Sequence, residues 1–227
     1  MPVQGDLFFI DKFKPLVDEK RQRLFHRLVY RLIYCTYRGH KDLQTAISFL
    51  SKRHLVCNEY DCRKLCRIIH YIHSMKNLKA VIGIEDIGRL ITFMDASYAV
   101  HMNMRSHTGA GMIFRIGVFS SDSKMQKLNT KSSTNAEIVV VSDFLSKIIY
   151  MYLFMEAHRY PIRENILYQN NQPAIKLKIN SRKSCSKKTC HMEIRYFYIK
   201  NFINKGIVIV KHYATKKMLA NYFTKPL

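Results

Sequence analysis

Four polar residues of this sequence lie where predicted strands end or within predicted helices, which is where metal-binding and catalytic side chains gather in sheet proteins. They are Asp95, Glu137, Asn170 and Asn221. Carboxylate and amide oxygens can both coordinate Mg2+, and two clustered divalent ions can hold a water in line for attack on a phosphodiester. Taken singly, Asp95 is better explained as a strand-end turn residue, and Glu137 as an acid favoured by the helix dipole. The four positions form a candidate site only if the fold brings them together.

From residue 90 onwards the hydrophobic pattern predicts an α/β fold, a mixed sheet covered by helices. Strands are expected at 90–94, 111–115, 117–120, 165–169 and 207–213. Helices are expected from 134 to 155, from about 172, at 193–204 and at 218–223. Thr134 and Glu137 match a capping box at the start of the long helix. Thr108 and Gly109 are expected in the turn that opens the second strand.

The first 78 residues predict a small all-helical segment. Apolar residues recur at helical spacing over 20–37, 43–50 and 60–74. Arginines alternate with the apolar residues of the first helix, so this helix has a basic face.

The chain is strongly basic, with 38 Lys and Arg against 16 Asp and Glu, a net charge of +22. Residues 1–90 carry 17 basic and nine acidic side chains, whereas residues 91–227 carry 21 and seven. The densest cluster holds six cations, which are Lys176, Lys178, Arg182, Lys183, Lys187 and Lys188. Such a surface attracts nucleic acid and would contact phosphates without selecting bases. His191 could contact the scissile phosphate. The alternative for the cluster is a solvated loop, and the alternative for His191 is a solvated or capping role.

Six cysteines are present, and their spacing is not the paired C-x2-C of structural zinc sites. We therefore expect reduced thiols rather than a zinc site or disulfides. The longest apolar run, residues 148–155, is shorter than the roughly 18 residues of a membrane span. The first residues lack the pattern of a secretory signal. The expected location is intracellular, cytoplasmic or nuclear, with no membrane partner.

Several short motifs, in a fixed order, resemble a known family. They are Asp95–His101, Arg105–Gly109, Gln126–Glu137, Tyr168–Ile175, Ile194–Phe197 and Ala220–Leu227. In this order they resemble the RNase H domain of copia-type retrotransposon Pol polyproteins, from about Leu90 to the last residue. The stretch from Leu24 to Tyr71 resembles the segment of the same polyproteins that follows the reverse transcriptase palm.

The resemblance implies two domains, a helical segment at 1–78 and an RNase H-like domain at 88–227. It implies an endonuclease that cuts the RNA strand of an RNA:DNA hybrid with two Mg2+ ions, with Asp95 and Glu137 as metal ligands. Asn170 and Asn221 would occupy the other two catalytic positions. The partners would be a hybrid or other nucleic acid and the rest of a reverse transcriptase. The Tyr-Met-Asp-Asp-type polymerase motif is absent, so the chain is not a polymerase by itself.

The sequence departs from the family pattern at two of the four acidic positions. The family carries aspartate where this chain has Asn170 and Asn221. Two divalent ions would meet two carboxylates in place of four, so we expect metal binding and hydrolysis to be impaired. The alternative interpretation is a non-catalytic, basic nucleic-acid-binding module or an unselected transposon relic.

Overall fold

The structure, a computed structural model, describes residues 5–11, 13–179 and 190–225. The three predicted N-terminal helices are present as α1 (Glu19–Arg38), α2 (Gln44–Ser51), which follows the short 3-10 helix η1 (Lys41–Leu43), and α3 (Glu59–Ser74). Asp18 caps α1, and Asn58 forms a capping box with Asp61 at the start of α3. The apolar faces of these helices pack into one core around Phe25 and Val29 of α1.

The second part of the chain is a five-stranded mixed sheet with the strand order β5-β3-β2-β6-β7. Its strands are β2 (Arg89–Ser97), β3 (His107–Ile113), β5 (Ser120–Met125), β6 (Glu164–Gln169) and β7 (Ile209–His212). Strands β2, β3 and β5 are antiparallel, whereas β6 pairs parallel with β2 and β7 parallel with β6. This is the RNase H-like arrangement, and the predicted fold class, with its preceding helices, is confirmed.

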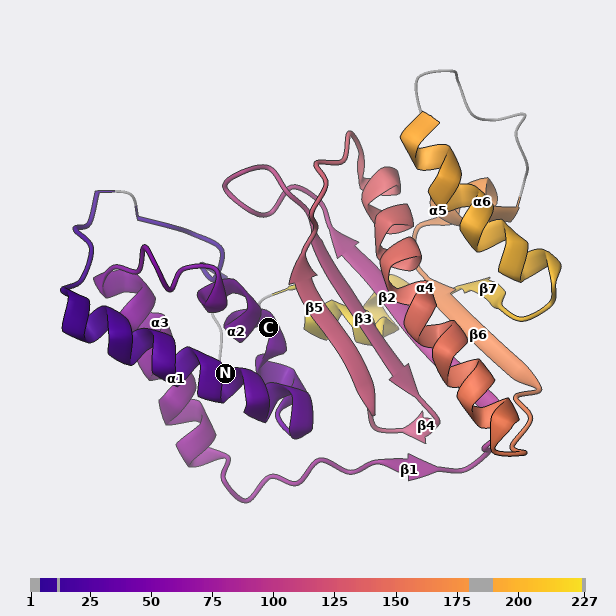
Figure 1. The fold of residues 1–227 in the computed structure, drawn as a ribbon, viewed down its shortest axis with the longest axis horizontal. Helices are drawn as coiled ribbons and strands as arrows, with labels where there is room; N and C mark the ends of the chain where they lie inside the picture. Colours follow the sequence, from indigo (N-terminus) through magenta and orange to yellow (C-terminus); the bar gives the residue numbers. More distant parts are fainter. Residues whose placement is uncertain (1–4, 12, 180–189, 226–227) are drawn as a thin grey trace.

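Helices cover one face of this sheet (Figure 1). The long α4 (Ser133–Ala157) crosses it, with α5 (Gln172–Ile179) and α6 (Cys190–Asn204) on the same side. Leu90, Met94, Leu145 and Ile148 are among the buried residues of the core beneath α4. Length and composition alone would let α4 cross a bilayer, a criterion that the buried helices of sheet proteins also meet.

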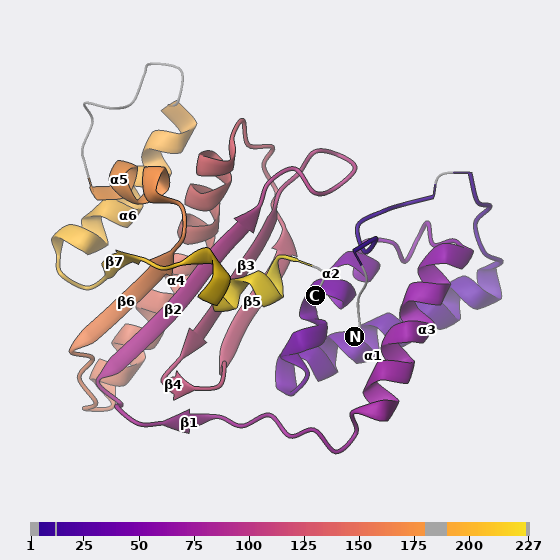
Figure 2. The ribbon, with the colours of Figure 1, turned by 180° about the vertical axis from the view of Figure 1, so that it is seen from behind.

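The C-terminal segment covers the opposite face of the sheet (Figure 2). It contains the short 3-10 helices η4 (Thr215–Lys217) and η5 (Leu219–Phe223). Met218 and Ala220 are buried there against Phe93 of β2. Both faces of β2 are therefore covered.

The positions of the second and third strands were predicted wrongly. The sequence pattern placed them at 111–115 and 117–120, but β3 begins at His107 and β5 covers Ser120–Met125. Thr108 and Gly109 accordingly lie within β3, not in a turn. Between these strands, β4 (Arg115–Ile116) pairs with β1 (Gly83–Ile84) in a separate two-stranded sheet. Of the two glycines that were interpreted as strand starts, Gly111 lies inside β3, and Gly117 lies in the bend after β4.

The helical segment docks on the β5 edge of the sheet through α2. Gln44 Nε2 donates to the carbonyl of Ser121 at 3.3 Å, and Thr45 Oγ1 donates to the carbonyl of Tyr222 at 3.1 Å. The edge strand is thereby covered rather than open to a second chain. The division into domains at 1–78 and 88–227 stays a prediction.

Candidate active site

Asp95 lies on the face of the sheet that the C-terminal segment covers. Side chains alternate along a strand, and in β2 Leu90 and Met94 join the core under α4, whereas Phe93 packs with Met218 on the other side. Asp95 points to the same face of β2 as Phe93, two residues before it, and its side chain is 4% exposed. The pattern of β2 therefore directs a buried carboxylate toward the C-terminal segment.

Both oxygens of the Asp95 carboxylate accept hydrogen bonds. Oδ1 accepts from Asn170 Nδ2 at 3.1 Å, and Oδ2 accepts from Thr224 Oγ1 at 2.6 Å. Lys225 Nζ lies 3.8 Å from Oδ2 and adds a positive charge. Because an ionised carboxylate only accepts, the amide of Asn170 must present its NH2 group to it. Asp95 is thus surrounded by donors from the end of β6 and from the C-terminal segment.

Gly109 makes the approach of the C-terminal segment possible. It pairs with Asp95 across β2 and β3. A Cβ at this position would lie 2.4 Å from Thr224 Cγ2 and 2.9 Å from the carbonyl oxygen of Ala220. A side chain there would therefore push Thr224 away from Asp95.

Glu137 points inward to the strand ends rather than capping its own helix. The predicted capping box is wrong, because Ser132 is the N-cap of α4 and accepts from the backbone of Asn135. Glu137 Oε1 accepts from the backbone N–H of Ala96 at 3.2 Å, and Oε2 accepts from Gln169 Nε2 at 2.8 Å. The residue is buried, with 4% of its surface exposed. Glu137 therefore contacts the residues next to Asp95 and Asn170 along the two central strands.

Asn221 makes no side-chain hydrogen bond to Asp95 among the described residues, but Lys225 and Thr224 contact both. Its Nδ2 donates to the carbonyl of Thr215 at 2.8 Å, and its Oδ1 accepts from Lys225 Nζ at 2.7 Å. Lys225 lies between Asn221 and Asp95. The structure thus brings all four predicted residues into one region, with Asp95 and Asn170 in direct contact.

These residues do not fit a pair of divalent metal ions. Among the residues that the structure describes, no three His, Cys, Asp or Glu side chains are grouped so as to hold a metal. Asp95 and Glu137 accept from N–H and O–H donors, and the ammonium group of Lys225 adds a positive charge where a metal would need negative ligands. The hydrogen-bond partners of Asp95 and Glu137 therefore do not support the predicted Mg2+ ligation by these two carboxylates.

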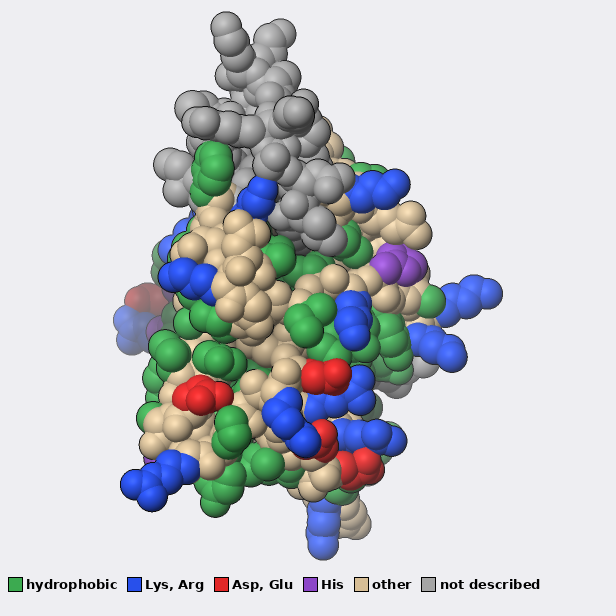
Figure 3. Space-filling view, turned by 90° about the vertical axis from the view of Figure 1, so that its right-hand side faces the viewer, with side chains coloured by type: hydrophobic (Ala, Val, Ile, Leu, Met, Phe, Trp, Pro, Cys, Tyr) green, Lys and Arg blue, Asp and Glu red, His purple; other side chains and the backbone are tan. Residues whose placement is uncertain are grey.

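The predicted phosphate-binding cluster falls mostly outside the described residues. Four of its six cations lie outside the described residues: Arg182, Lys183, Lys187 and Lys188. Lys176 is an exposed residue of α5. Lys178 lies in α5 and His191 in α6, but their side chains are not among those described. On the face shown in Figure 3, Lys and Arg side chains outnumber Asp and Glu.

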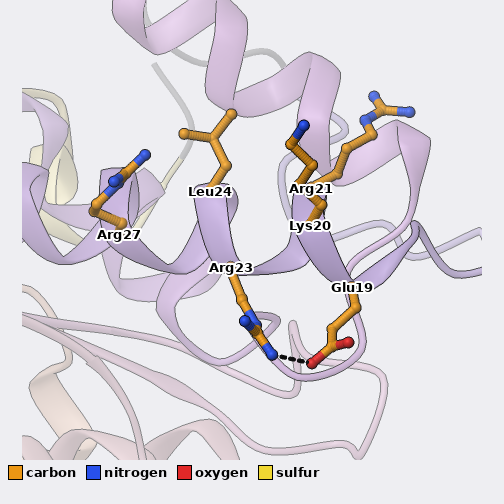
Figure 4. A pocket seen from close by; sticks show the side chains of 6 residues that line it. All are labelled: Glu19, Lys20, Arg21, Arg23, Leu24 and Arg27. Atoms are coloured by element: carbon orange, nitrogen blue, oxygen red, sulfur yellow. Dashed lines mark hydrogen bonds and ion pairs between the residues drawn. The ribbon is translucent and has the colours of Figure 1, made fainter.

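A second basic surface lies on α1, as predicted from its arginines. A hollow of about 730 Å3 is lined there by Glu19, Lys20, Arg21, Arg23, Leu24 and Arg27. Figure 4 shows these side chains on α1, with Arg23 paired to Glu19. Arg21 pairs with Glu59 of α3 at 2.8 Å. These ion pairs are exposed and neutralise part of the surface.

The cysteine prediction can be followed for four of the six residues. Cys35, Cys57, Cys62 and Cys66 are free thiols. Burial raises the pKa of Cys62 to about 11, so this thiol stays protonated at neutral pH.

Three residues of the site were missed by sequence reasoning. Gln169 holds Glu137, Thr224 holds Asp95, and Lys225 links Asp95 to Asn221. All three lie in the motifs that carry the resemblance, which was the signal that could have found them. The roles of Thr224 and Lys225 depend on the packing of the C-terminal segment on β3, which no spacing reveals.

The sequence is similar to retrotransposon polyproteins. It is 28% identical over 229 residues to the Retrovirus-related Pol polyprotein from transposon TNT 1-94 of Nicotiana tabacum, covering 99% of this chain. It is 29% identical over 189 residues to the Pol polyprotein from transposon RE1 of Arabidopsis thaliana, covering 82% of this chain. The chain spans 17% and 13% of the lengths of these two relatives. No family model matches the sequence.

Solved structures show a weaker likeness. LC11-RNase H1, isolated from compost, aligns with 60% of this chain and 92% of its own length, at a TM-score of 0.45 and 11% identity. The Prototype Foamy Virus protease-reverse transcriptase aligns with 94% of this chain and 26% of its own, at a TM-score of 0.38 and 11% identity. The sequence matches and the strand order agree with each other: the chain is distantly similar to copia-type Pol polyproteins over most of its length and has an RNase H-like fold.

Proposed function

We propose that the chain is a nucleic-acid-binding, RNase H-like module of a retrotransposon Pol polyprotein that holds RNA:DNA hybrids and is impaired in cutting their RNA strand. The similarity to Pol polyproteins makes a hybrid the ligand to test. The net charge of +22 supports binding to a polyanion.

The observation that carries the impaired cleavage is the contact between Asn170 and Asp95. Hydrolysis by two metals needs an anionic ligand at the end of β6, and this chain presents an NH2 group there, 3.1 Å from Asp95 Oδ1. The ammonium of Lys225 lies on the other side of the same carboxylate. The charge that would otherwise attract Mg2+ is thus partly neutralised by the protein itself.

A binding titration tests the first half of the proposal. Fluorescence anisotropy of a labelled hybrid, titrated at several NaCl concentrations, should show affinity that falls steeply with salt, because binding releases counterions. The affinity in Mg2+ should be no higher than in EDTA, because binding rests on Lys and Arg rather than on bound metal and because Mg2+ competes for the phosphates. An affinity that is flat with salt, or that needs Mg2+, would contradict the proposal. Double-stranded DNA of equal length serves as the comparison ligand for hybrid preference.

A further inference from the structure

A basic hollow lies where the helical segment meets the sheet. Its volume is about 460 Å3. Its cations come from the end of α2, from the loop between β2 and β3, from β5 and the loop that follows it, and from α6. They are Lys52, Arg105, Lys124, Lys127 and Arg195. The fold therefore gathers charges that are far apart in the sequence.

The acids near the hollow do not balance these charges. Asp143 lines it and pairs with Arg195 at 2.7 Å. Asp122 pairs with Lys124 at 3.2 Å but also with Lys147 at 2.6 Å. Among the described residues, no carboxylate lies within ion-pair distance of the remaining three cations, Lys52, Arg105 and Lys127. Like charges held together repel one another, so an anion in the hollow would be stabilising.

The floor of the hollow is held by hydrogen bonds and lies next to the candidate active site. Gln126 forms part of it and donates through Nε2 to the carbonyl of Ala136 at 3.0 Å and to Thr108 Oγ1 at 3.3 Å. The backbone N–H of Gln126 donates to the carbonyl of Ser106 at 2.8 Å, which holds the loop that carries Arg105. Ala136 precedes Glu137 in α4. The hollow and the carboxylates thus share one end of the sheet.

We propose that this hollow binds phosphate groups of a nucleic-acid backbone, an inference that rests on the proposed function and gives it a location. Arginine and lysine side chains bind phosphate through charge-assisted hydrogen bonds. Lys52, Arg105 and Lys127 come from three separate segments, and the hollow is larger than one phosphate needs, so the cations suit successive phosphates of a strand. The NH2 group of Gln126 is already hydrogen-bonded and its Oε1 is buried, so this amide does not contact bases. Binding there is therefore independent of base sequence.

A charge-matched comparison tests the hollow. The triple variant Lys52→Ala, Arg105→Ala, Lys127→Ala removes three cations of the hollow. The control Lys76→Ala, Lys79→Ala, Lys205→Ala removes three exposed cations elsewhere. The hollow variant should bind the labelled hybrid at least tenfold more weakly at low salt, and its salt slope should fall by about one unit for each phosphate that the protein no longer neutralises. The control should keep the wild-type slope. Equal weakening in both variants would show that only net charge matters and would refute the hollow as a site.

Lysine footprinting distinguishes a failure of the hollow as a phosphate site from a failure of the proposed function. Lys52 and Lys127 are exposed, so an amine-acetylating reagent can reach them, as it can Lys76 and Lys79. We expect the hybrid, and inorganic pyrophosphate as a small phosphate probe, to protect Lys52 and Lys127 and to leave Lys76 and Lys79 reactive. Protection by pyrophosphate without hybrid binding would refute the proposed function while supporting a phosphate site. Full reactivity of Lys52 and Lys127 under both anions would refute the hollow as a phosphate site.

Discussion

We expect Asp95→Asn to lower the free energy of unfolding of this protein. In a metal-free site made of several carboxylates, the same substitution would raise it. Carboxylates grouped for metal ions repel one another, so neutralising one of them stabilises the metal-free protein. Here the Asp95 carboxylate accepts from Asn170 and Thr224 and lies 3.8 Å from Lys225 Nζ. The substitution removes the charge that these donors stabilise.

The size of the effect follows from the two hydrogen bonds. Each bond to a charged, buried group contributes about 1.5–3 kcal/mol. The new amide keeps one oxygen, which can still accept from Thr224, while its NH2 group faces the NH2 group of Asn170. Asn170 is only partly buried and can turn its oxygen toward the new donor, so part of the second bond is recovered. The net loss should be about 1–3 kcal/mol.

Urea unfolding followed by circular dichroism measures this loss. With a slope of about 2 kcal/mol per molar, the midpoint should fall by about 0.5–1.5 M. Asp86→Asn is a suitable control, because Asp86 pairs with Arg163 on the surface, where solvent screens the ion pair and its loss should change the midpoint little. A midpoint for Asp95→Asn that is unchanged or higher than that of the wild type would refute the description of Asp95 as a satisfied carboxylate.

Three further changes in stability follow from the fold, each measurable by urea unfolding. Ile148→Ala removes a fully buried side chain between α4 and the sheet and should cost about 2–5 kcal/mol; a midpoint within error of wild type would contradict this packing. Gly109→Ala should cost about 1–3 kcal/mol, because its Cβ would lie 2.4 Å from Thr224 Cγ2; an unaffected protein would mean that the C-terminal segment does not pack on β3. Burial lowers the pKa of His101 to about 4 and of His107 to about 3. Below pH 6.5 the unfolded chain therefore binds more protons than the folded one, so the free energy of unfolding should fall from pH 7 to pH 4.5. His107→Gln should weaken this dependence, and an identical pH profile would exclude His107 as its source.

The sequence predicts the elements that have strong periodicity. The predicted helix over 134–155 corresponds to α4, and the apolar run 90–94 corresponds to β2. Both have a hydrophobic pattern that identifies the element whatever it packs against. Strand β3 was misplaced because His107-Thr-Gly-Ala-Gly contains residues of low strand propensity. It is a strand because it pairs on both sides with β2 and β5 and because Gly109 leaves room for the C-terminal segment.

The structure brings the four predicted residues into one region, but the sequence did not predict their contacts. The sequence pattern placed Asp95 and Asn170 at strand ends and Glu137 at a helix start; β2 continues past Asp95 to Ser97, and the parallel pairing of β2 with β6 brings these positions together. The orientation of Asn221 toward Thr215, and the position of Lys225 beside Asp95, depend on the fold of residues 214–225 over the sheet. Such long-range packing leaves no periodic signal in the sequence. The hollow lined by Lys52 and Arg105 was missed for the same reason.

Cleavage of an end-labelled hybrid tests the central claim most directly. With Mg2+, the wild-type chain should leave the RNA strand intact, and the double variant Asn170→Asp, Asn221→Asp should gain RNA cleavage that disappears again on adding Asp95→Asn, because the two new carboxylates supply anionic ligands. Asn170→Asp alone should recover more activity than Asn221→Asp alone, since Asn170 contacts Asp95 whereas Asn221 faces Thr215 and Lys225. Mg2+-dependent cleavage by the wild-type chain that is abolished by Asp95→Asn would contradict the claim.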